Sequence, residues 1–242
     1  MLIPAAGTAL GGLAILAVGR PADRTLDLLL GFTAGVMLAA TFFSLLEPAL
    51  ERGSLWEVAV GFVLGGASLA ALDMWAPHAH ERFDERGHAP PGSAPPRRRA
   101  LMLLSAITIH NIPEGLAVGV AFAAGGVELG VPVALAITVQ NVPEGFAAAA
   151  PLLEAGTSRR RVAAIGAATG LVEPPAALAG FAALTLGTIL LPAGMGFAAA
   201  AMIYVVADEL LPECFARGNE RVATLALLSG FLLMMGLDAG FG

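Results

Sequence analysis

Long apolar stretches, separated by short breaks rich in charge, Pro or Gly, fill the chain from one end to the other. A helix that crosses a bilayer needs roughly 20 consecutive apolar residues, and the breaks leave eight stretches of about that length. They cover approximately residues 2–19, 26–50, 55–77, 100–123, 130–152, 161–185, 189–213 and 222–240. The pattern therefore predicts an all-α integral membrane protein with one transmembrane domain over residues 1–242.

The composition supports this interpretation. Hydrophobic residues make up 57% of the chain, charged residues 13%, and the mean hydropathy is +0.79, values far from those of soluble domains. The first stretch has no preceding basic residue, so we expect a retained helix and not a cleavable signal peptide. Cys214 is the single cysteine, which excludes an intrachain disulfide.

The basic residues predict the orientation in the membrane. All 13 are arginines, and 12 of them lie in the connections after the first, third, fifth and seventh stretches. These 12 are Arg20, Arg24, Arg82, Arg86, Arg97, Arg98, Arg99, Arg159, Arg160, Arg161, Arg217 and Arg221. Since basic loops stay in the cytoplasm, we expect both termini outside and the 78–99 connection inside. That connection carries His78, His80 and His88, which could bind metal transiently, but the scattered spacing favours a solvated linker.

One six-residue phrase occurs twice, as HNIPEG at 110–115 and QNVPEG at 140–145, each inside an apolar stretch. A carboxylate in the membrane is costly unless a cation or a hydrogen-bond donor meets it. Pro113 and Pro143 should kink their helices and free the carbonyls of Ile109 and Val139. Because successive spans run in opposite directions, the two phrases should meet near the membrane midplane, and residues four apart share a helix face. The predicted pocket consists of His110, Asn111, Glu114, Gln140, Asn141 and Glu144.

Two other stretches carry polar groups that could serve this pocket. Glu173 is followed by Pro174 and Pro175 and repeats the arrangement of a carboxylate beside prolines. A divalent cation that bridges Glu114, Glu144 and Glu173 would offset the cost of burying them. In the second stretch Thr41, Ser44 and Glu47 follow the helical spacing of a polar stripe. Met37 lies near that stripe, where a thioether is either a packing group or a ligand for softer ions.

The seventh stretch ends in YVVADELLPE, which places Asp208, Glu209 and Glu213 at the predicted depth of Asp73. Imidazole, amide and carboxylate groups together suit zinc and neighbouring ions. The acids at the cytoplasmic side therefore form either a candidate exit site for a cation (Asp73, Asp208 and Glu209) or an ordinary acidic interface. Residues alone leave these two interpretations open.

At these residues the chain resembles the ZIP family of divalent-metal transporters, most closely its bacterial branch. The resemblance rests on HNIPEG, QNVPEG, VEPPAA in the sixth stretch, GFTAGVMLAATFFSLL in the second and YVVADELLPE in the seventh. It implies eight helices in which two inverted three-helix repeats flank a central pair, helices four and five. It also implies uptake of Zn²⁺ or a related ion (Fe²⁺, Mn²⁺, Co²⁺ or Cd²⁺) into the cytoplasm across the cell membrane, through one rigid bundle that slides against another.

The family's site residues can be placed on matching positions of this sequence. By resemblance, His110, Glu114, Gln140 and Glu144 would hold a primary ion, with Met37 nearby. Asn111, Asn141 and Glu173 would complete a second position that shares Glu114 and Glu144. Members are often dimeric, so a homodimer is expected. The metal is the transported substrate, and neither a cofactor nor a nucleic-acid partner is expected.

Other functions remain compatible with the residues. The two phrases could belong to unrelated kinked helices whose carboxylates bond within the bundle. An intramembrane metallohydrolase would need a metal with an open position and a nearby general base, but the chain has no H-E-x-x-H motif and one His within the predicted spans. A metal sensor could use the same pocket without transport, and a transporter of another substrate could use the carboxylates as a proton relay.

Overall fold

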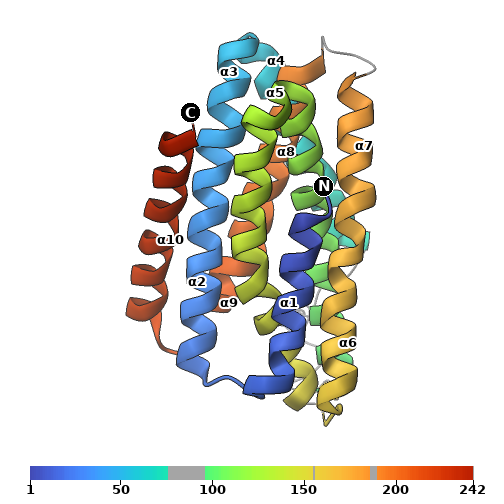
Figure 1. Cartoon of the computed structure of the whole chain (residues 1–242), viewed down its shortest axis with the longest axis vertical. Coiled ribbons are helices and arrows are strands. Elements are labelled where there is room, and N and C mark those ends of the chain that lie inside the picture. The colour runs from blue at the N-terminus through green and yellow to red at the C-terminus, as the bar shows by residue number, and fades with distance from the viewer. Residues whose placement is uncertain (76–95, 155, 186–189, 242) are drawn as a thin grey trace.

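The computed structural model describes residues 1–75, 96–154, 156–185 and 190–241. Every element in this part of the chain is a helix, and most of the helices run along one long axis (Figure 1). In chain order they are α1 (Ile3–Val18), α2 (Asp23–Ala39), η1 (Ala40–Leu46), α3 (Glu47–Arg52), α4 (Leu55–Trp75), α5 (Pro96–Glu154), α6 (Arg159–Thr169), η3 (Gly170–Val172), α7 (Glu173–Thr185), α8 (Leu191–Val205), η5 (Val206–Leu210), α9 (Leu211–Cys214) and α10 (Glu220–Phe241). The all-α prediction is confirmed for these residues.

Six helical stretches of the described chain are long and apolar enough to cross a membrane. They are Asp23–Arg52, Leu55–Leu72, Thr108–Ala147, Arg159–Thr185, Leu191–Cys214 and Glu220–Gly240. The apolar helix α1 has 16 residues, which at 1.5 Å per residue is about 24 Å and less than the roughly 30 Å of a hydrocarbon core. The chain is therefore built as a multi-pass membrane protein.

The long helix α5 contains a reversal. Gly125 (φ −138°, ψ 19°) and Gly126 (φ 59°, ψ −136°) have non-helical backbones, and the positive φ of Gly126 is a conformation that L side chains rarely adopt. The two halves of α5 run antiparallel on either side of this turn, since His110 contacts Glu144, whereas Glu114, further along the first half, contacts Gln140, which comes earlier in the second. The helix continues through Pro113 and Pro143, so the kink predicted at each proline stays a prediction.

Two segments of π-helix interrupt helices that the sequence pattern treats as regular. The segment η1 joins α2 to α3 and ends shortly before Pro48, while η5 joins α8 to α9 and ends shortly before Pro212. A proline ring clashes with the carbonyl four residues back, here that of Ser44 or Asp208, and a wider π turn accommodates this clash. Both wide turns therefore have a local cause in the sequence.

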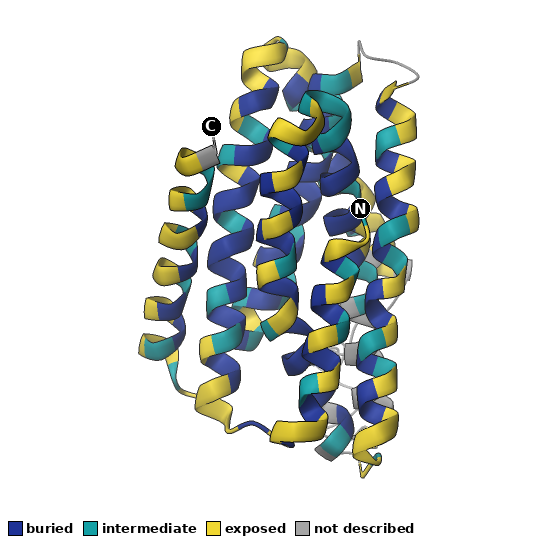
Figure 2. Cartoon of the chain, viewed as in Figure 1, coloured by how far each residue is buried: buried dark blue, intermediate teal, exposed yellow. Residues whose placement is uncertain are grey.

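The helices form two packed groups. In one group α1 and α7 pack on α5, and α6 packs on α1; in the other, α2 packs on α10 and α4 on α8. Helix α5 also contacts α2 and α8, which joins the groups. An apolar groove of about 480 Å³ lies between α4 and α8 on one side and α5 and α7 on the other. Buried residues line the inner faces of the helices, while α10 turns an exposed apolar face outwards (Figure 2).

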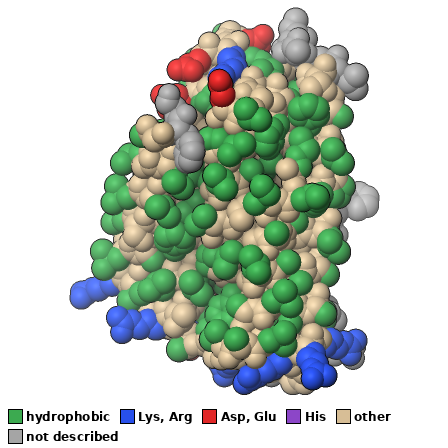
Figure 3. Space-filling model, viewed as in Figure 1, with side chains coloured by type: hydrophobic (Ala, Val, Ile, Leu, Met, Phe, Trp, Pro, Cys, Tyr) green, Lys and Arg blue, Asp and Glu red, His purple; other side chains and the backbone are tan. Residues whose placement is uncertain are grey.

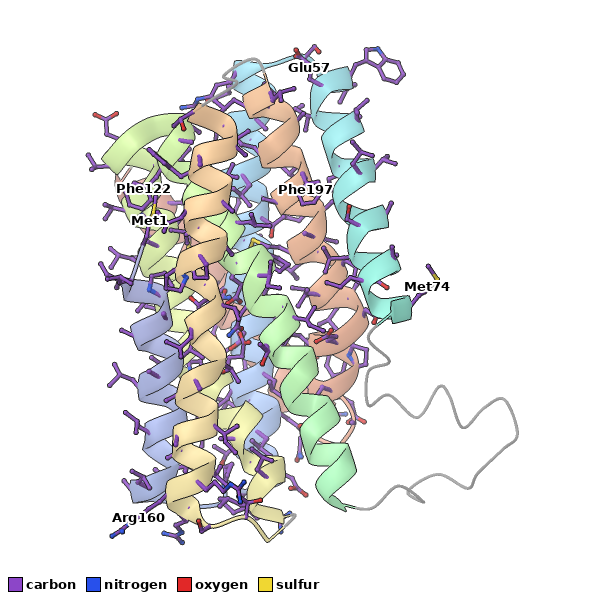
Figure 4. The ribbon with its side chains drawn as sticks, turned by 90° about the vertical axis from the view of Figure 1, so that its right-hand side faces the viewer. Met1, Glu57, Met74, Phe122, Arg160 and Phe197 are labelled. Carbon is purple, nitrogen blue, oxygen red and sulfur yellow. The ribbon has the colours of Figure 1, made fainter. Side chains whose placement is uncertain are left out.

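Charge separates along the long axis. On the face drawn in Figure 3, basic side chains gather at the end where α1 meets α2, and acidic side chains with a lone basic one lie at the other end. Glu57 and Arg160 mark these opposite ends in Figure 4. The band between them is mainly apolar, as expected for a lipid-facing surface.

Candidate metal site

The two halves of α5 bring both copies of the repeated phrase into direct contact. His110 Nε2 is bonded to Glu144 Oε1, and Gln140 Nε2 donates to Glu114 Oε1 at 2.5 Å. Each bond joins one copy to the other, because antiparallel helices place the start of one phrase beside the end of the next. All four residues are at most 3% exposed. The structure therefore brings the two phrases together in the bundle interior, as the spacing predicts.

Glu173 joins the same interior cluster from the start of α7. Asn141 Nδ2 donates to Glu173 Oε1 at 3.0 Å and to the Pro4 carbonyl at 3.3 Å. Thr8 Oγ1 donates to the same Glu173 oxygen at 2.6 Å. A short 3₁₀ turn, η3, separates α6 from α7 just before Glu173, so the carboxylate lies where the helix changes type. Helix α1 thus supplies two groups to the site.

The described residues contain six buried side-chain nitrogen or oxygen atoms without a hydrogen-bond partner, and every one belongs to a residue of the predicted pocket or to Glu173. They are Asn111 Nδ2, Glu114 Oε2, Gln140 Oε1, Asn141 Oδ1, Glu144 Oε2 and Glu173 Oε2. Five of the six are oxygen acceptors. Leaving a buried polar group unpaired costs about 1–3 kcal/mol, so the fold tolerates a concentrated deficit of donors here. A cation would meet that deficit.

The side chains are not arranged around a common point. Within the described residues no three His, Cys, Asp or Glu groups have the placement of a metal site. The ligand candidates are instead bonded to one another. Met37 is fully buried, and its carbonyl accepts from Thr41 Oγ1 at 2.8 Å. The geometry is that of ligands paired among themselves, which an arriving ion would have to separate.

The predicted polar stripe of the second stretch is only partly correct. Thr41 and Ser44 are buried, and Ser44 Oγ donates to Asp238 Oδ1 at 2.9 Å, but Glu47 is exposed. A polar stripe at this spacing requires an α-helix, whereas these residues lie in or just after the π-helix η1. A π turn contains more residues than an α turn, so Glu47 is rotated away from the face of the other two.

Glu209 and Glu213 take part in different polar contacts. Glu209 Oε2 lies 2.8 Å from His110 Nδ1, so this residue is part of the central cluster and is not separated from it. Glu213 is instead bonded to Arg217, which also donates to the buried Asp27 at 2.8 Å. Asp208 lies beside Glu209 in η5. The side chain of Asp73 lies outside the described part of the chain, as do His78, His80 and His88.

Sequence reasoning missed Thr8 and the position of Glu209. Thr8 is the single polar side chain in Ile3–Val18, and a lone hydroxyl in an apolar helix is the signal that could have marked it. The placement of Glu209 depends on how α8 packs against α5, which no local pattern contains. Residues 97–99 lie in the first turn of α5 and not in the preceding loop.

Comparison with known proteins gives the family. The profile described as ZIP zinc transporter matches residues 76–238. The chain belongs to the ZIP family. It is 42% identical to the zinc transporter ZIPB of Bordetella bronchiseptica, over 98% of this chain and 78% of that protein. It is 40% identical to the zinc transporter GufA of Myxococcus xanthus, over 100% and 97% of the two chains, and 35% identical to human zinc transporter ZIP11, over 97% and 94%.

Membership of the ZIP family confirms the resemblance, including its bacterial branch. The family consists of transporters and not of enzymes, so the metallohydrolase alternative is set aside. The similarity to the family extends over almost the whole chain, because the two bacterial relatives align with 98% and 100% of it. In a ZIP protein, a transported metal ion is the candidate partner of the unpaired oxygen atoms in the central cluster.

Proposed function

We propose that this ZIP protein carries divalent transition-metal ions, zinc first among them, across the cell membrane into the cytoplasm. The observation that carries the proposal is the set of six unpartnered atoms, all on residues of the central cluster. The relatives named as zinc transporters support the choice of ion. Cd²⁺, Fe²⁺, Mn²⁺ and Co²⁺ are further candidate substrates, because imidazole and carboxylate ligands bind all of them.

Two ion positions are implied by the resemblance of these residues to the ZIP family's site. His110, Glu114, Gln140 and Glu144 would hold a primary ion beside the thioether of Met37, and Asn111, Asn141 and Glu173 would complete a bridged second position. Of the three glutamates of this set, Glu144 contacts a basic side chain, His110, whereas the hydrogen-bond partners of Glu114 and Glu173 are neutral amide and hydroxyl groups. Among the described residues, Glu114 and Glu173 therefore have no cationic partner in the absence of metal. A divalent ion supplies the missing positive charge and the missing bonds together.

The topology supports eight spans built from two inverted repeats. Counting the two halves of α5 as helices four and five makes α1, α2 and α4 the first repeat, and α6–α7, α8 and α10 the second. A two-fold axis that relates the repeats would exchange α2 with α8 and α4 with α10. The contact between α2 and α10 should then have a counterpart between α8 and α4, and both contacts are observed. The π-helices η1 and η5 also fall in corresponding helices, the second of each repeat. Such repeats with a central site are common in transporters.

The charge distribution supports the direction of transport. Arg159 lies beside the end of α1, and Arg217 contacts the start of α2, so arginines from distant connections gather at one end. By the positive-inside rule this end faces the cytoplasm and both termini lie outside. Glu209 is the acid of the candidate exit set that touches His110. An ion released from His110 would therefore meet Glu209 and Asp208 on the cytoplasmic side.

Alternating access would expose the cluster to each side in turn. The apolar groove between α4–α8 and α5–α7 supports a movement of one helix group against the other, because part of this boundary is not closely packed. The bond between His110 in α5 and Glu209 in η5 joins the two groups and would break during such a movement. The expected homodimer stays a prediction, which the mass of the detergent-solubilised protein would check.

The test measures zinc uptake into proteoliposomes that contain a zinc-sensitive dye. Wild type is compared, at two pH values, with a Glu114→Ala, Glu144→Ala double variant. A matched Glu51→Ala, Glu220→Ala variant removes two exposed acids and should transport normally. Loss of uptake in the first variant alone supports the proposal. Equal uptake by all three proteins refutes the site, and folded wild type that binds zinc without flux favours the sensor function.

A further inference from the structure

A single hydroxyl on α1 occupies one side of a carboxylate in the central cluster. Thr8 is 2% exposed, and its Oγ1 donates to Glu173 Oε1 at 2.6 Å. Asn141 Nδ2 donates to the same oxygen at 3.0 Å, whereas Glu173 Oε2 has no partner. The two oxygens of Glu173 are therefore not equivalent: one is saturated by protein donors and the other is free.

Two glycines build the slot that holds Thr8. A Cβ added at Gly145 would lie 2.4 Å from the Thr8 carbonyl oxygen, and one added at Gly170 would lie 2.8 Å from the Thr8 Cβ. Both distances are shorter than real Cβ contacts, so α1 approaches α5 and the α6 end as closely as it does only because these positions lack side chains. The slot fixes where the Thr8 hydroxyl can be.

Thr8 also occupies a special place in the repeat. A Cβ added at Gly115, which closes the first copy of the phrase, would lie 2.4 Å from the Glu173 carbonyl oxygen. A Cβ added at Gly145, which closes the second copy, would lie at the same distance from the Thr8 carbonyl oxygen. Thr8 thus packs against the last glycine of the second copy in the same way as Glu173 packs against the last glycine of the first copy. One repeat supplies a carboxylate at this place, and the other supplies the hydroxyl that binds it.

We propose that Thr8 is a positioning residue of the transport site, and that its hydroxyl holds Glu173 so that Oε2 alone is presented to the ion. This inference rests on the proposed function and adds α1 to the machinery. Thr8 does not ligate the metal; it keeps Glu173 a one-oxygen ligand of fixed orientation. Removing a group that hydrogen-bonds to a metal ligand typically weakens metal binding by about 10–100-fold.

The test compares Thr8→Val, which keeps the size and shape but loses the donor, with Thr8→Ser, which keeps the donor. We expect Thr8→Val to raise the half-saturating zinc concentration for uptake by about tenfold with little change in the maximal rate, and Thr8→Ser to behave as wild type. Equilibrium zinc binding to the purified protein should weaken in parallel. Thr169→Val is the matched control, because this buried hydroxyl donates only to the Gly166 carbonyl of its own helix.

A double-variant cycle separates positioning from general packing. If Thr8 acts through Glu173, then Thr8→Val should have no further effect on zinc binding once Glu173→Gln is present. Additive losses, a Thr8→Val protein equal to wild type, or a Thr8→Ser protein as weak as Thr8→Val would each overturn the inference. Should Thr8→Val fold poorly, Thr8→Ala, which cannot crowd the two glycines, gives the same readout. Failure of wild-type uptake would count against the proposed function instead.

Discussion

Glu114 offers a test in which stability and function should change in opposite directions. The side chain is fully buried, Gln140 binds its Oε1, and neither its Oε2 nor the Oε1 of Gln140 has a partner. Replacing Glu114 with Gln keeps the shape, removes the negative charge and adds two N–H donors. One of these can meet the free Gln140 oxygen. The metal-free variant should therefore be more stable than wild type.

The size of the effect follows from the atoms involved. Removing an orphaned buried polar group is worth about 1–3 kcal/mol, which for a chain of this length is a rise in Tm of roughly 2–12 °C. Zinc at a hundred times its Kd should stabilise wild type by about 2.7 kcal/mol, and this increment should be lost in the variant. Uptake should fall at least about tenfold. The assay is thermal unfolding in detergent, with and without chelator, alongside proteoliposome flux.

Asp27 provides a control in which replacing a buried carboxylate by an amide should lower the stability instead of raising it. It too is a fully buried carboxylate, but Arg217 and Asn219 bind its two oxygens at 2.8 Å and 2.9 Å. Burial lowers the pKa of the Arg217 guanidinium, but the neighbouring Glu213 and Asp27 raise it above its usual value. Asp27→Asn should therefore lower stability by about 1.5–3 kcal/mol. A Glu114→Gln protein that is less stable than metal-free wild type, or that zinc still stabilises, would refute the reasoning.

Three further predictions follow from the same structure. Gly35→Ala should lower the free energy of unfolding by about 1–3 kcal/mol, because the added Cβ would lie 1.9 Å from the Leu227 carbonyl oxygen. Gly66→Ala should leave the stability unchanged, because open space surrounds Gly66. Denaturation in detergent measures both variants, and equal stabilities would contradict this packing. Zinc uptake should weaken as the pH falls, because protons compete with the metal for its ligands; an initial-rate profile that is flat with pH would exclude this competition. Met37→Leu should reduce Cd²⁺ uptake more than Mn²⁺ uptake, because the thioether is a soft ligand; parallel losses for the two ions would leave Met37 as a packing residue.

Periodicity and motif spacing predicted much of what the structure shows. The repeated phrase indicated that the residues of 110–115 and 140–145 meet, and the two helix halves do place His110 against Glu144 and Gln140 against Glu114. Antiparallel neighbours with a glycine turn leave little freedom in register, so a local pattern was sufficient. The polar stripe failed at Glu47 because a proline widened the turn into a π-helix, which shifts the helical period.

The sequence by itself determined that the chain is helical, crosses a membrane and buries carboxylates at the two matched phrases, because apolar length and the cost of buried charge act locally along the chain. Only the tertiary structure decided that Thr8 binds one oxygen of Glu173 and that Glu209 reaches His110. Residues 165 and 99 positions apart form these contacts. Helix packing sets them, and it depends on which backbones glycine allows to approach, a property of pairs of helices that no single stretch contains.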